Sequence, residues 1–213
     1  MAEGAGVIRY LAFVPVSLAF TLLALILAPL LPLFTVSRFG PCDNASDMRV
    51  GARLPLWLSW FDTPDNDLSG DGAWRRFEPG HWAFRAKLQN WPILQTYLGA
   101  VGWLWRNSAY GFQWHGPISG KILPGARVKW CGSPLTQNGP RFHPGHCLTV
   151  VENVDGSWYW HFYYVRQITA TRCVNVNLGW KLKTFAEDPH RLEGATRARF
   201  TFSPRVTGFT SPT

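Results

Sequence analysis

The chain has 213 residues, of which 46% are hydrophobic and 15% aromatic, and its formal net charge is +8. About 175 residues follow an apolar N-terminal run, which is enough for one domain with a substantial core and excludes a large multidomain protein. The charge is uneven: residues 39–120 hold seven basic and seven acidic side chains, whereas residues 121–213 hold twelve and five. This surplus predicts a face that contacts a polyanion, either anionic lipid headgroups or nucleic acid, or that only keeps the protein soluble.

An uncharged apolar run extends from Leu11 to Ser37 and is flanked by Arg9 and Arg38. The run exceeds the about 20 apolar residues that a helix needs to cross a bilayer core. Pro29 and Pro32 are expected to kink or end this helix. We therefore predict an uncleaved transmembrane anchor over residues 1–38. A cleaved signal peptide is the alternative, although it would have a shorter apolar core and a small-residue cleavage site.

Basic residues near the apolar run predict its orientation. Arg38, Arg49 and Arg53 follow the run, and only Arg9 and the amino terminus precede it. Because basic residues are enriched on the cytoplasmic side, the C-terminal domain is predicted to be cytoplasmic. The four cysteines, at positions 42, 131, 147 and 173, could form two disulfides in an oxidising compartment or stay as buried thiols.

Residues 39–120 are predicted to be an aromatic-rich, partly helical linking region. Leu54 to Phe61 contains Trp57 and Trp60, and tryptophan close to an anchor is typical of the membrane interface. Two helices are expected, over Trp82–Asn90 and from Pro92 to Arg106. The second is too short to cross a bilayer, so it lies in the interface plane or packs against the following domain.

Residues 121–205 are predicted to form an antiparallel β-sheet domain, followed by a flexible tail over 206–213. The chain is therefore expected to be an α+β protein with one N-terminal helix, short helices and then a sheet of at least four strands. Asp155-Gly156 between two β-prone runs predicts a hairpin with a type I′ turn that organises the domain. The expected strands are Arg127–Cys131, Leu148–Val154, Trp158–Ile168, Cys173–Leu182 and Arg197–Phe202.

An acidic segment matches the first half of a calcium-binding loop. Its candidate ligands are the side chains of Asp62, Asp65, Asp67, Ser69 and Asp71. Oxygen ligands at alternate positions before a glycine suit a hard cation. The twelfth position of the loop, however, holds Arg76 where a bidentate glutamate is needed. Asp, Asn and Gly also form turns, so we expect a surface turn rather than a high-affinity calcium site.

A second candidate metal site surrounds a Pro-Gly turn. It comprises Cys131, His143, His146 and Cys147, which are residue types that bind zinc. Their spacing matches no standard zinc pattern, and a cysteine–histidine nucleophilic pair is a further alternative. The aromatic strand Trp158–Tyr164, with Arg166, either stacks on bases or sugars or is buried on both faces.

A basic surface is predicted near the C-terminus. The side chains assigned to it are Lys181, Lys183, Arg197 and Arg199. Period-two alternation places Arg197 and Arg199 on one face of their strand, which we expect to be solvated and to contact anionic lipid or another polyanion.

Four segments together resemble a family of small uncharacterised membrane-anchored proteins encoded by tailed bacteriophages. They are WFDTPDNDLSGDGAW (Trp60–Trp74), WLWRNSAYGF (Trp103–Phe112), NLGWKL (Asn177–Leu182) and FTFSPR (Phe200–Arg205). The resemblance implies a phage or prophage origin and an anchor in the bacterial inner membrane, and it brings no activity or functional residue.

No catalytic motif is complete in this sequence, which favours a non-enzymatic accessory protein. We expect it to act at the host inner membrane through the lipid bilayer, anionic headgroups or a host or phage membrane protein, without a cofactor. The alternatives are a membrane-bound hydrolase that uses calcium or zinc at one of the two candidate sites, and a membrane-associated component of the virion.

Overall fold

The computed structural model describes residues 2–42, 47–76, 87–108, 110–114, 118–137, 143–183 and 197–209. The chain forms two compact units. Unit 1 comprises residues 1–14 and 116–213, and unit 2 comprises residues 15–115. The division falls inside helix α1 (Ala2–Leu27), between Val14 and Pro15, so each unit uses part of the apolar N-terminal run.

Helix α1 begins and ends earlier than the apolar run predicts. It covers 26 residues, keeps Pro15 in its interior and stops two residues before Pro29. A short 3-10 helix, η1 (Leu31–Phe34), follows with Pro32 in its first turn. The prediction that Pro29 and Pro32 end the helix is confirmed, because a proline supplies no N–H for helical bonding.

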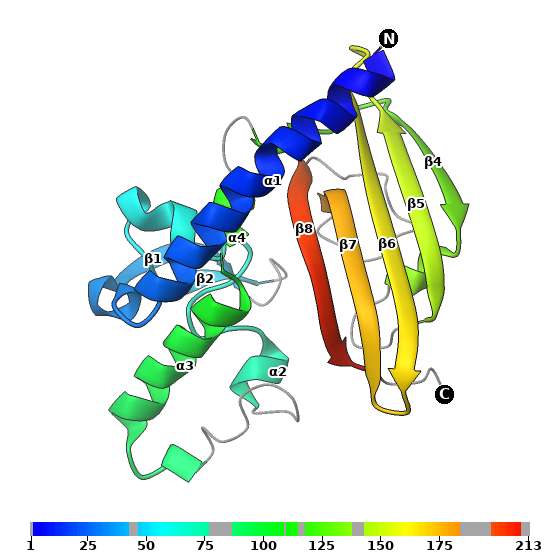
Figure 1. Ribbon diagram of the computed structural model, residues 1–213. Helices are drawn as coiled ribbons and strands as arrows, with labels where there is room; N and C mark the ends of the chain where they lie inside the picture. The colour runs from blue at the N-terminus through cyan, green and yellow to red at the C-terminus, as the bar shows by residue number, and fades with distance from the viewer. Residues whose placement is uncertain are drawn as a thin grey trace. The chain divides into compact units, whose positions relative to one another are not determined.

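Unit 2 contains several short helices and strands (Figure 1). After η1 come the strands β1 (Val36–Cys42) and β2 (Asp47–Arg53), the 3-10 helix η2 (Leu56–Phe61), and the helices α2 (Gly72–Arg75), α3 (Pro92–Arg106) and α4 (Tyr110–Trp114). The predicted helix from Pro92 to Arg106 is confirmed. The core consists of Ala28, Leu31, Leu54, Leu58, Leu68, Trp74, Ala100, Trp103 and Leu104.

The sequence did not predict β1 and β2, which pair as an antiparallel hairpin. Gly40, Pro41 and Gly51 interrupt any β-prone run there, and tertiary packing overrides the weak local preference. The helix expected over Trp82–Asn90 falls largely outside the described residues.

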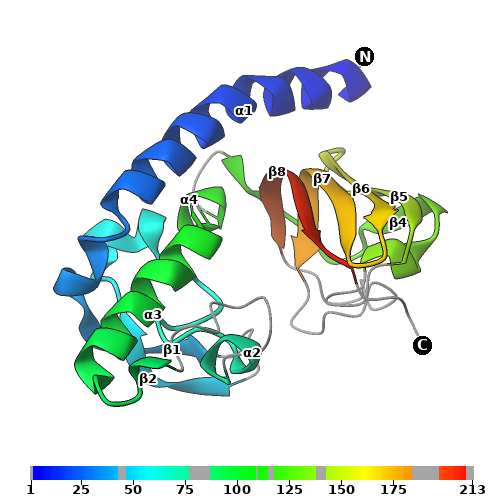
Figure 2. The ribbon, with the colours of Figure 1, turned by 60° about the horizontal axis from the view of Figure 1, so that its bottom comes forward.

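Besides the start of α1, unit 1 contains a six-stranded antiparallel sheet with the order β3-β8-β7-β6-β5-β4 (Figure 2). Its strands are β3 (Gly120–Lys121), β4 (Arg127–Gly132), β5 (Gly145–Glu152), β6 (Trp158–Thr169), β7 (Arg172–Lys183) and β8 (Arg197–Gly208), and the 3-10 helix η5 (Pro134–Gln137) lies between β4 and β5. The predicted α+β class, with a mainly antiparallel sheet after an N-terminal helix, is confirmed.

The hairpin between β5 and β6 forms as predicted, but its turn differs. The Asn153 N–H bonds to the Ser157 carbonyl at 2.8 Å and the Gly156 N–H bonds to the Asn153 carbonyl at 3.0 Å. Gly156 has φ of +82°. This is a three-residue loop, Val154 to Gly156, that ends in a left-handed glycine. The predicted type I′ turn is wrong because the Gly156 N–H closes a β-turn centred on Val154 and Asp155, not on Asp155 and Gly156.

Strand β8 extends to Gly208, so it includes residues 206–208 of the expected tail. Val206 pairs with Val174 and Pro204 pairs with Val176. The strand is therefore longer than the predicted Arg197–Phe202, and it includes Pro204.

Candidate functional site

Helix α1 buries one narrow stripe and exposes an apolar face. Tyr10, Ser17 and Ala24 are buried, and Ala28 continues their line beyond the helix. A spacing of seven residues is two helical turns, so these side chains share one side of the helix. The exposed side chains include Ile8, Leu11, Leu18, Leu22, Leu25 and Ile26. An exposed apolar face of this size is typical of a surface that contacts another apolar phase.

By length and composition, Gly6–Leu27 could cross a membrane, a property that it shares with signal sequences and with core helices of soluble proteins. The narrow buried stripe distinguishes α1 from a core helix, which would be apolar and covered on all sides.

The first turns of α1 belong to the core of unit 1. The Tyr10 hydroxyl donates to the Thr201 carbonyl of β8 at 3.0 Å. The Tyr10 ring lies 4.9 Å from the Trp160 ring and 5.1 Å from the Phe200 ring, measured between centroids. Phe13 contacts Phe200 as well. These residues therefore cover the aromatic face of the sheet.

The end of α1 is closed by α3 in unit 2. Pro29 has no N–H, so the Leu25 carbonyl lacks its normal helical donor. The Trp105 indole N–H bonds to that carbonyl at 2.9 Å. The Tyr97 hydroxyl donates to the Pro29 carbonyl. Two polar aromatic groups of α3 thus satisfy carbonyls that the proline break leaves open.

Further apolar side chains are exposed beside this helix end. Leu56 and Trp57 of η2 are 74% and 71% exposed, and the Trp57 ring contacts Phe34 of η1 at 5.8 Å. Ile93, at the start of α3, is 87% exposed. Most of the large exposed apolar side chains among the described residues belong to unit 2. Trp57 of the aromatic stretch Leu54–Phe61 is therefore on the surface, and its contact with a membrane interface stays a prediction.

The acidic segment is buried, which corrects the prediction of a surface turn. Asp62, Asn66, Asp67 and Leu68 are all at most 4% exposed. Burial of these residues is possible because their polar groups have protein partners, and it is favoured because Leu68 belongs to the apolar core.

Each candidate calcium ligand bonds to a protein group. Asp67 accepts from the N–H and hydroxyl of Ser69 and from the Cys42 thiol at 3.4 Å. Asp65 accepts from the Tyr110 hydroxyl at 2.7 Å. Asp71 caps α2 through the Trp74 N–H at 2.8 Å. In the part of the chain that the structure describes, no three His, Cys, Asp or Glu side chains are grouped so as to hold a metal ion.

Arg53 of β2 and Asp62, the first residue of the acidic segment, are buried charged residues. Arg53 is 2% exposed and donates to the Asn66 carbonyl at 3.1 Å. Asp62 pairs with Arg38 at 3.2 Å. Burial raises the pKa of Asp62 to about 6, although Arg53 and Arg38 oppose the shift. The predicted orientation of the apolar run relied on Arg53 as one of three basic residues that follow the run. Because Arg53 is buried, it no longer supports that orientation.

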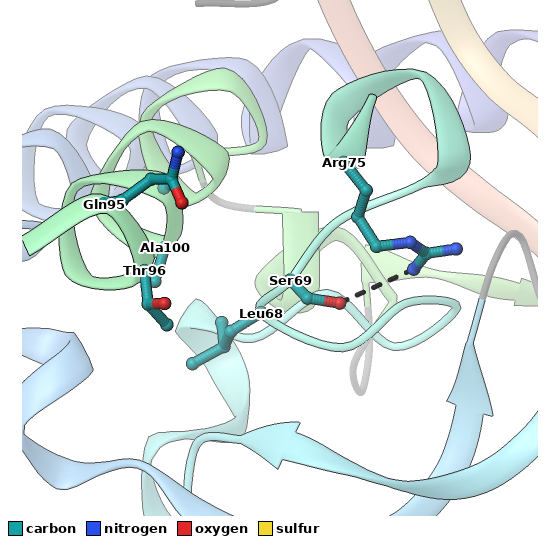
Figure 3. A pocket seen from close by; sticks show the side chains of 7 residues that line it. Leu68, Ser69, Arg75, Gln95, Thr96 and Ala100 are labelled. Carbon is teal, nitrogen blue, oxygen red and sulfur yellow. Dashed lines mark hydrogen bonds between the residues drawn. The ribbon is translucent and has the colours of Figure 1, made fainter. Parts of the chain in front are cut away.

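A shallow cavity of about 150 Å³ lies between the acidic segment and α3 (Figure 3). Its lining consists of Leu68, Ser69, Arg75, Gln95, Thr96, Gly99 and Ala100. The Arg75 guanidinium points toward Ser69 and donates to the Gly70 carbonyl at 2.6 Å. Because its one cationic group is engaged by the loop and the space is small, this cavity does not favour an organic substrate.

The candidate zinc residues are not brought together. Gly132 pairs with Cys147 and Cys131 pairs with Leu148, so the side chains of Cys131 and Cys147 point to opposite faces of the sheet. His146 precedes Cys147 on β5, so it points away from Cys147 and shares the face of Cys131, whose cross-strand partner Leu148 lies two residues further along β5. His143 lies before that strand. All four cysteines of the chain are free thiols.

The basic residues of β7 and β8 are only partly exposed. Lys181 pairs with Arg199, and Lys183 pairs with Arg197. Arg197 is exposed, but Arg199 is 8% exposed, so the prediction of a solvated face is wrong for Arg199. Alternation indicates the shared face correctly, but it does not indicate what covers that face.

A buried polar row on the same face of the sheet was not predicted. The His161 ring nitrogen Nε2 hydrogen-bonds to Asn177 Oδ1, and Asn175 donates to the Tyr163 hydroxyl at 3.0 Å. Burial lowers the pKa of His161 to about 3, so its imidazole is neutral in the folded protein. The sequence shows only an aromatic run there, in which a single histidine gives no distinctive pattern.

The model of the family of unknown function DUF7338 matches residues 1–207. This match spans α1 and both units, and the chain belongs to that family. No curated protein matches the chain, and no solved structure matches it.

Proposed function

We propose that this member of the DUF7338 family is a non-enzymatic accessory protein that works at a membrane, through contacts with lipid or with another membrane protein. The observation that carries the proposal is the exposed apolar face of α1, which in unit 2 includes Leu22 and Ile26, each more than 60% exposed. Leaving such side chains in water costs about 1.5–3 kcal/mol each relative to burial. Membrane lipid would remove that cost.

Unit 2 supports the same proposal by the placement of its charges. Arg53, Asp62 and Asp67 are buried with partners, whereas Trp57 and Ile93 are exposed. Charged side chains that face the protein interior and apolar side chains that face outward are the distribution of a lipid-contacting unit.

The resemblance to phage-encoded proteins favours the inner membrane of an infected bacterium as the place of action. A cytoplasmic location of unit 1 is part of the proposal. The excess of basic residues that supports this location consists of Arg38 and Arg49 after the apolar run against Arg9 before it, since Arg53 is buried.

Flotation of the full chain with bacterial membranes tests the proposal. We compare the natural chain with Leu18→Gln/Leu22→Gln/Ile26→Gln in unit 2, and use Val154→Gln/Ile168→Gln/Val206→Gln as the matched control in unit 1, since all six side chains are exposed. The natural chain and the control should float after a high-salt wash, and the α1 variant should lose membrane binding by more than tenfold. Recovery of the natural chain in the soluble fraction would contradict the proposal, as would undiminished flotation of the α1 variant.

A further inference from the structure

We infer that the chain enters the membrane from one side only, with an apolar end of unit 2 in a single leaflet, and that α1 does not cross. The apolar end consists of Leu30, Leu33, Phe34, Trp57, Ile93 and Leu94, all of which are exposed. The inference rests on the proposed membrane function, and it replaces the single transmembrane span that the sequence predicts.

The part of α1 that is available to lipid is too short to cross a bilayer. Tyr10 and Phe13 are part of the aromatic core of unit 1. Only residues 15–27 of α1 belong to unit 2. That stretch of helix rises about 20 Å, whereas a hydrocarbon core is about 30 Å thick. The remaining helix is long enough for one leaflet and too short for two.

A crossing by α1 would place charged side chains of the sheet in the hydrocarbon. If α1 crossed with its first turns in the bilayer, the strands that Tyr10 contacts would enter the hydrocarbon with it. Strand β8 carries Arg197 and Arg199, and Lys181 is on the neighbouring β7. Placing even one such charge at the bilayer centre costs about 2.5–3.5 kcal/mol or more. Crossing would therefore require α1 to leave the sheet and expose the aromatic residues around Tyr10.

The apolar end is built so that its backbone carbonyls have side-chain donors. Tyr97 and Trp105 of α3 bond to the carbonyls of Pro29 and Leu25, so α3 runs against the end of α1 in the opposite direction (Figure 1). Ile93 and Leu94 lie one turn before Tyr97 and share its side of α3. In lipid, where no water can satisfy a carbonyl, these two side-chain bonds are what a broken helix end needs.

Lipid is the occupant that fits this surface. The apolar end is contributed by η1, η2, α3 and the segment after α1, and it continues into the exposed Leu22 and Ile26 of α1. Acyl chains adapt to such an uneven surface without matching its shape. Trp57 and the exposed Trp91 supply the amphipathic aromatic side chains that are enriched at the boundary between lipid and water.

Two-sided labelling in sealed vesicles tests the inference. All variants carry Cys131→Ser, because Cys131 is the exposed native cysteine and the other three are buried. Glu3→Cys and Ser37→Cys place single reactive thiols before and after the apolar run, and Val206→Cys marks the sheet. A membrane-impermeant maleimide is added outside. All three thiols should be modified from the same side, to the same extent. Modification of Glu3→Cys and Ser37→Cys from opposite sides would overturn the inference.

Quenching by brominated phosphatidylcholine separates the remaining outcomes. A fluorophore is attached at Ile93→Cys, at Leu22→Cys or at Val206→Cys, in the same Cys131→Ser background. We expect strong quenching at the first two positions and none at the third. Quenching at Leu22→Cys without quenching at Ile93→Cys would overturn the inference and leave the proposed function intact. No quenching at either position, together with a failure to float, would reject both. Cross-linking between Ile93→Cys thiols of two chains would show that a second copy, not lipid, covers the apolar end.

Discussion

Unit 1 and unit 2 distribute their apolar and charged side chains in different ways. Unit 1 buries Trp180 and Phe200 and leaves Arg166, Arg172 and Arg197 exposed, as proteins in water do. Unit 2 buries Arg53 and Asp62 and leaves Ile93, Leu56 and Trp57 exposed. This difference is what the proposed membrane function predicts, in which the sheet lies in water and the helical unit contacts lipid.

The largest expected effect comes from removing a buried charge in unit 2. Arg53→Met removes one of the two cations near Asp62, the other being Arg38, and it removes the guanidinium donor to the Asn66 carbonyl. We expect unit 2 to lose about 3–5 kcal/mol of unfolding free energy, measured by hydrogen exchange of its amides. Arg49→Met, on the same strand but largely exposed, is the matched control and should have a much smaller effect. Equal effects of the two changes would mean that the burial of Arg53 is not what stabilises unit 2.

The two units should also respond to acid in opposite directions, and the larger response belongs to unit 1. The pKa of His161 is lowered to about 3 by burial, whereas an unfolded histidine titrates near 6.5. The unfolded chain therefore takes up the proton first, and stability falls as the pH drops below about 6.5. Between pH 6.5 and 4.5 we expect unit 1 to lose about 2–3 kcal/mol. His161→Gln should remove this pH dependence from exchange measurements on the strands. If the stability of unit 1 still depends on pH after the substitution, another titrating group causes that dependence.

The response of unit 2 has the opposite sign. The pKa of Asp62 is raised to about 6, above its value in the unfolded chain, so the folded state binds the proton more tightly. Stability then rises as the pH falls through 6, by about 2 kcal/mol at pH 4.5. Asp62→Asn should flatten this part of the profile for amides of η2 and α3. If the stability of unit 2 falls between pH 6 and pH 4.5, the predicted stabilisation by protonation of Asp62 is wrong.

The smallest expected effect concerns the turn of unit 1. Gly156 has φ of +82° with open space around it, so Gly156→Val should cost about 1–2 kcal/mol through backbone strain alone. Gly208→Ala is the control, because Gly208 also has open space but no positive φ, and it should change stability by less than about 0.5 kcal/mol. Denaturation of the sheet measures both. A similar cost at the two positions would show that strain is not the cause.

Local patterns in the sequence were sufficient to predict α3, the β5–β6 hairpin and the main strands. The alternation of β6 and the helical spacing of α3 report directly on backbone geometry. The prolines at 29 and 32 predicted the end of α1 for the same reason, since their effect on the backbone is local.

What the sequence could not predict depends on contacts between distant segments. Arg53, Asp62 and Arg199 are residue types that are mostly exposed, and their burial follows from partners far along the chain. The buried stripe of α1 was hidden because Ser17 and Ala24 lie inside a uniformly apolar run. Tyr10 was likewise read as part of an anchor, although its hydroxyl bonds to a strand 191 residues away.

Spin-label accessibility at exposed positions of both units tests the central claim most directly. Labels at Ile26, Trp57 and Ile93 report on unit 2, and labels at Val154, Ile168 and Val206 report on unit 1; all six side chains are exposed. In vesicles containing the full chain, the three unit 2 labels should be relaxed mainly by oxygen, which concentrates in lipid. The three unit 1 labels should be relaxed mainly by a water-soluble nickel complex. If all six labels are more accessible to nickel than to oxygen, unit 2 does not face lipid and the account is wrong.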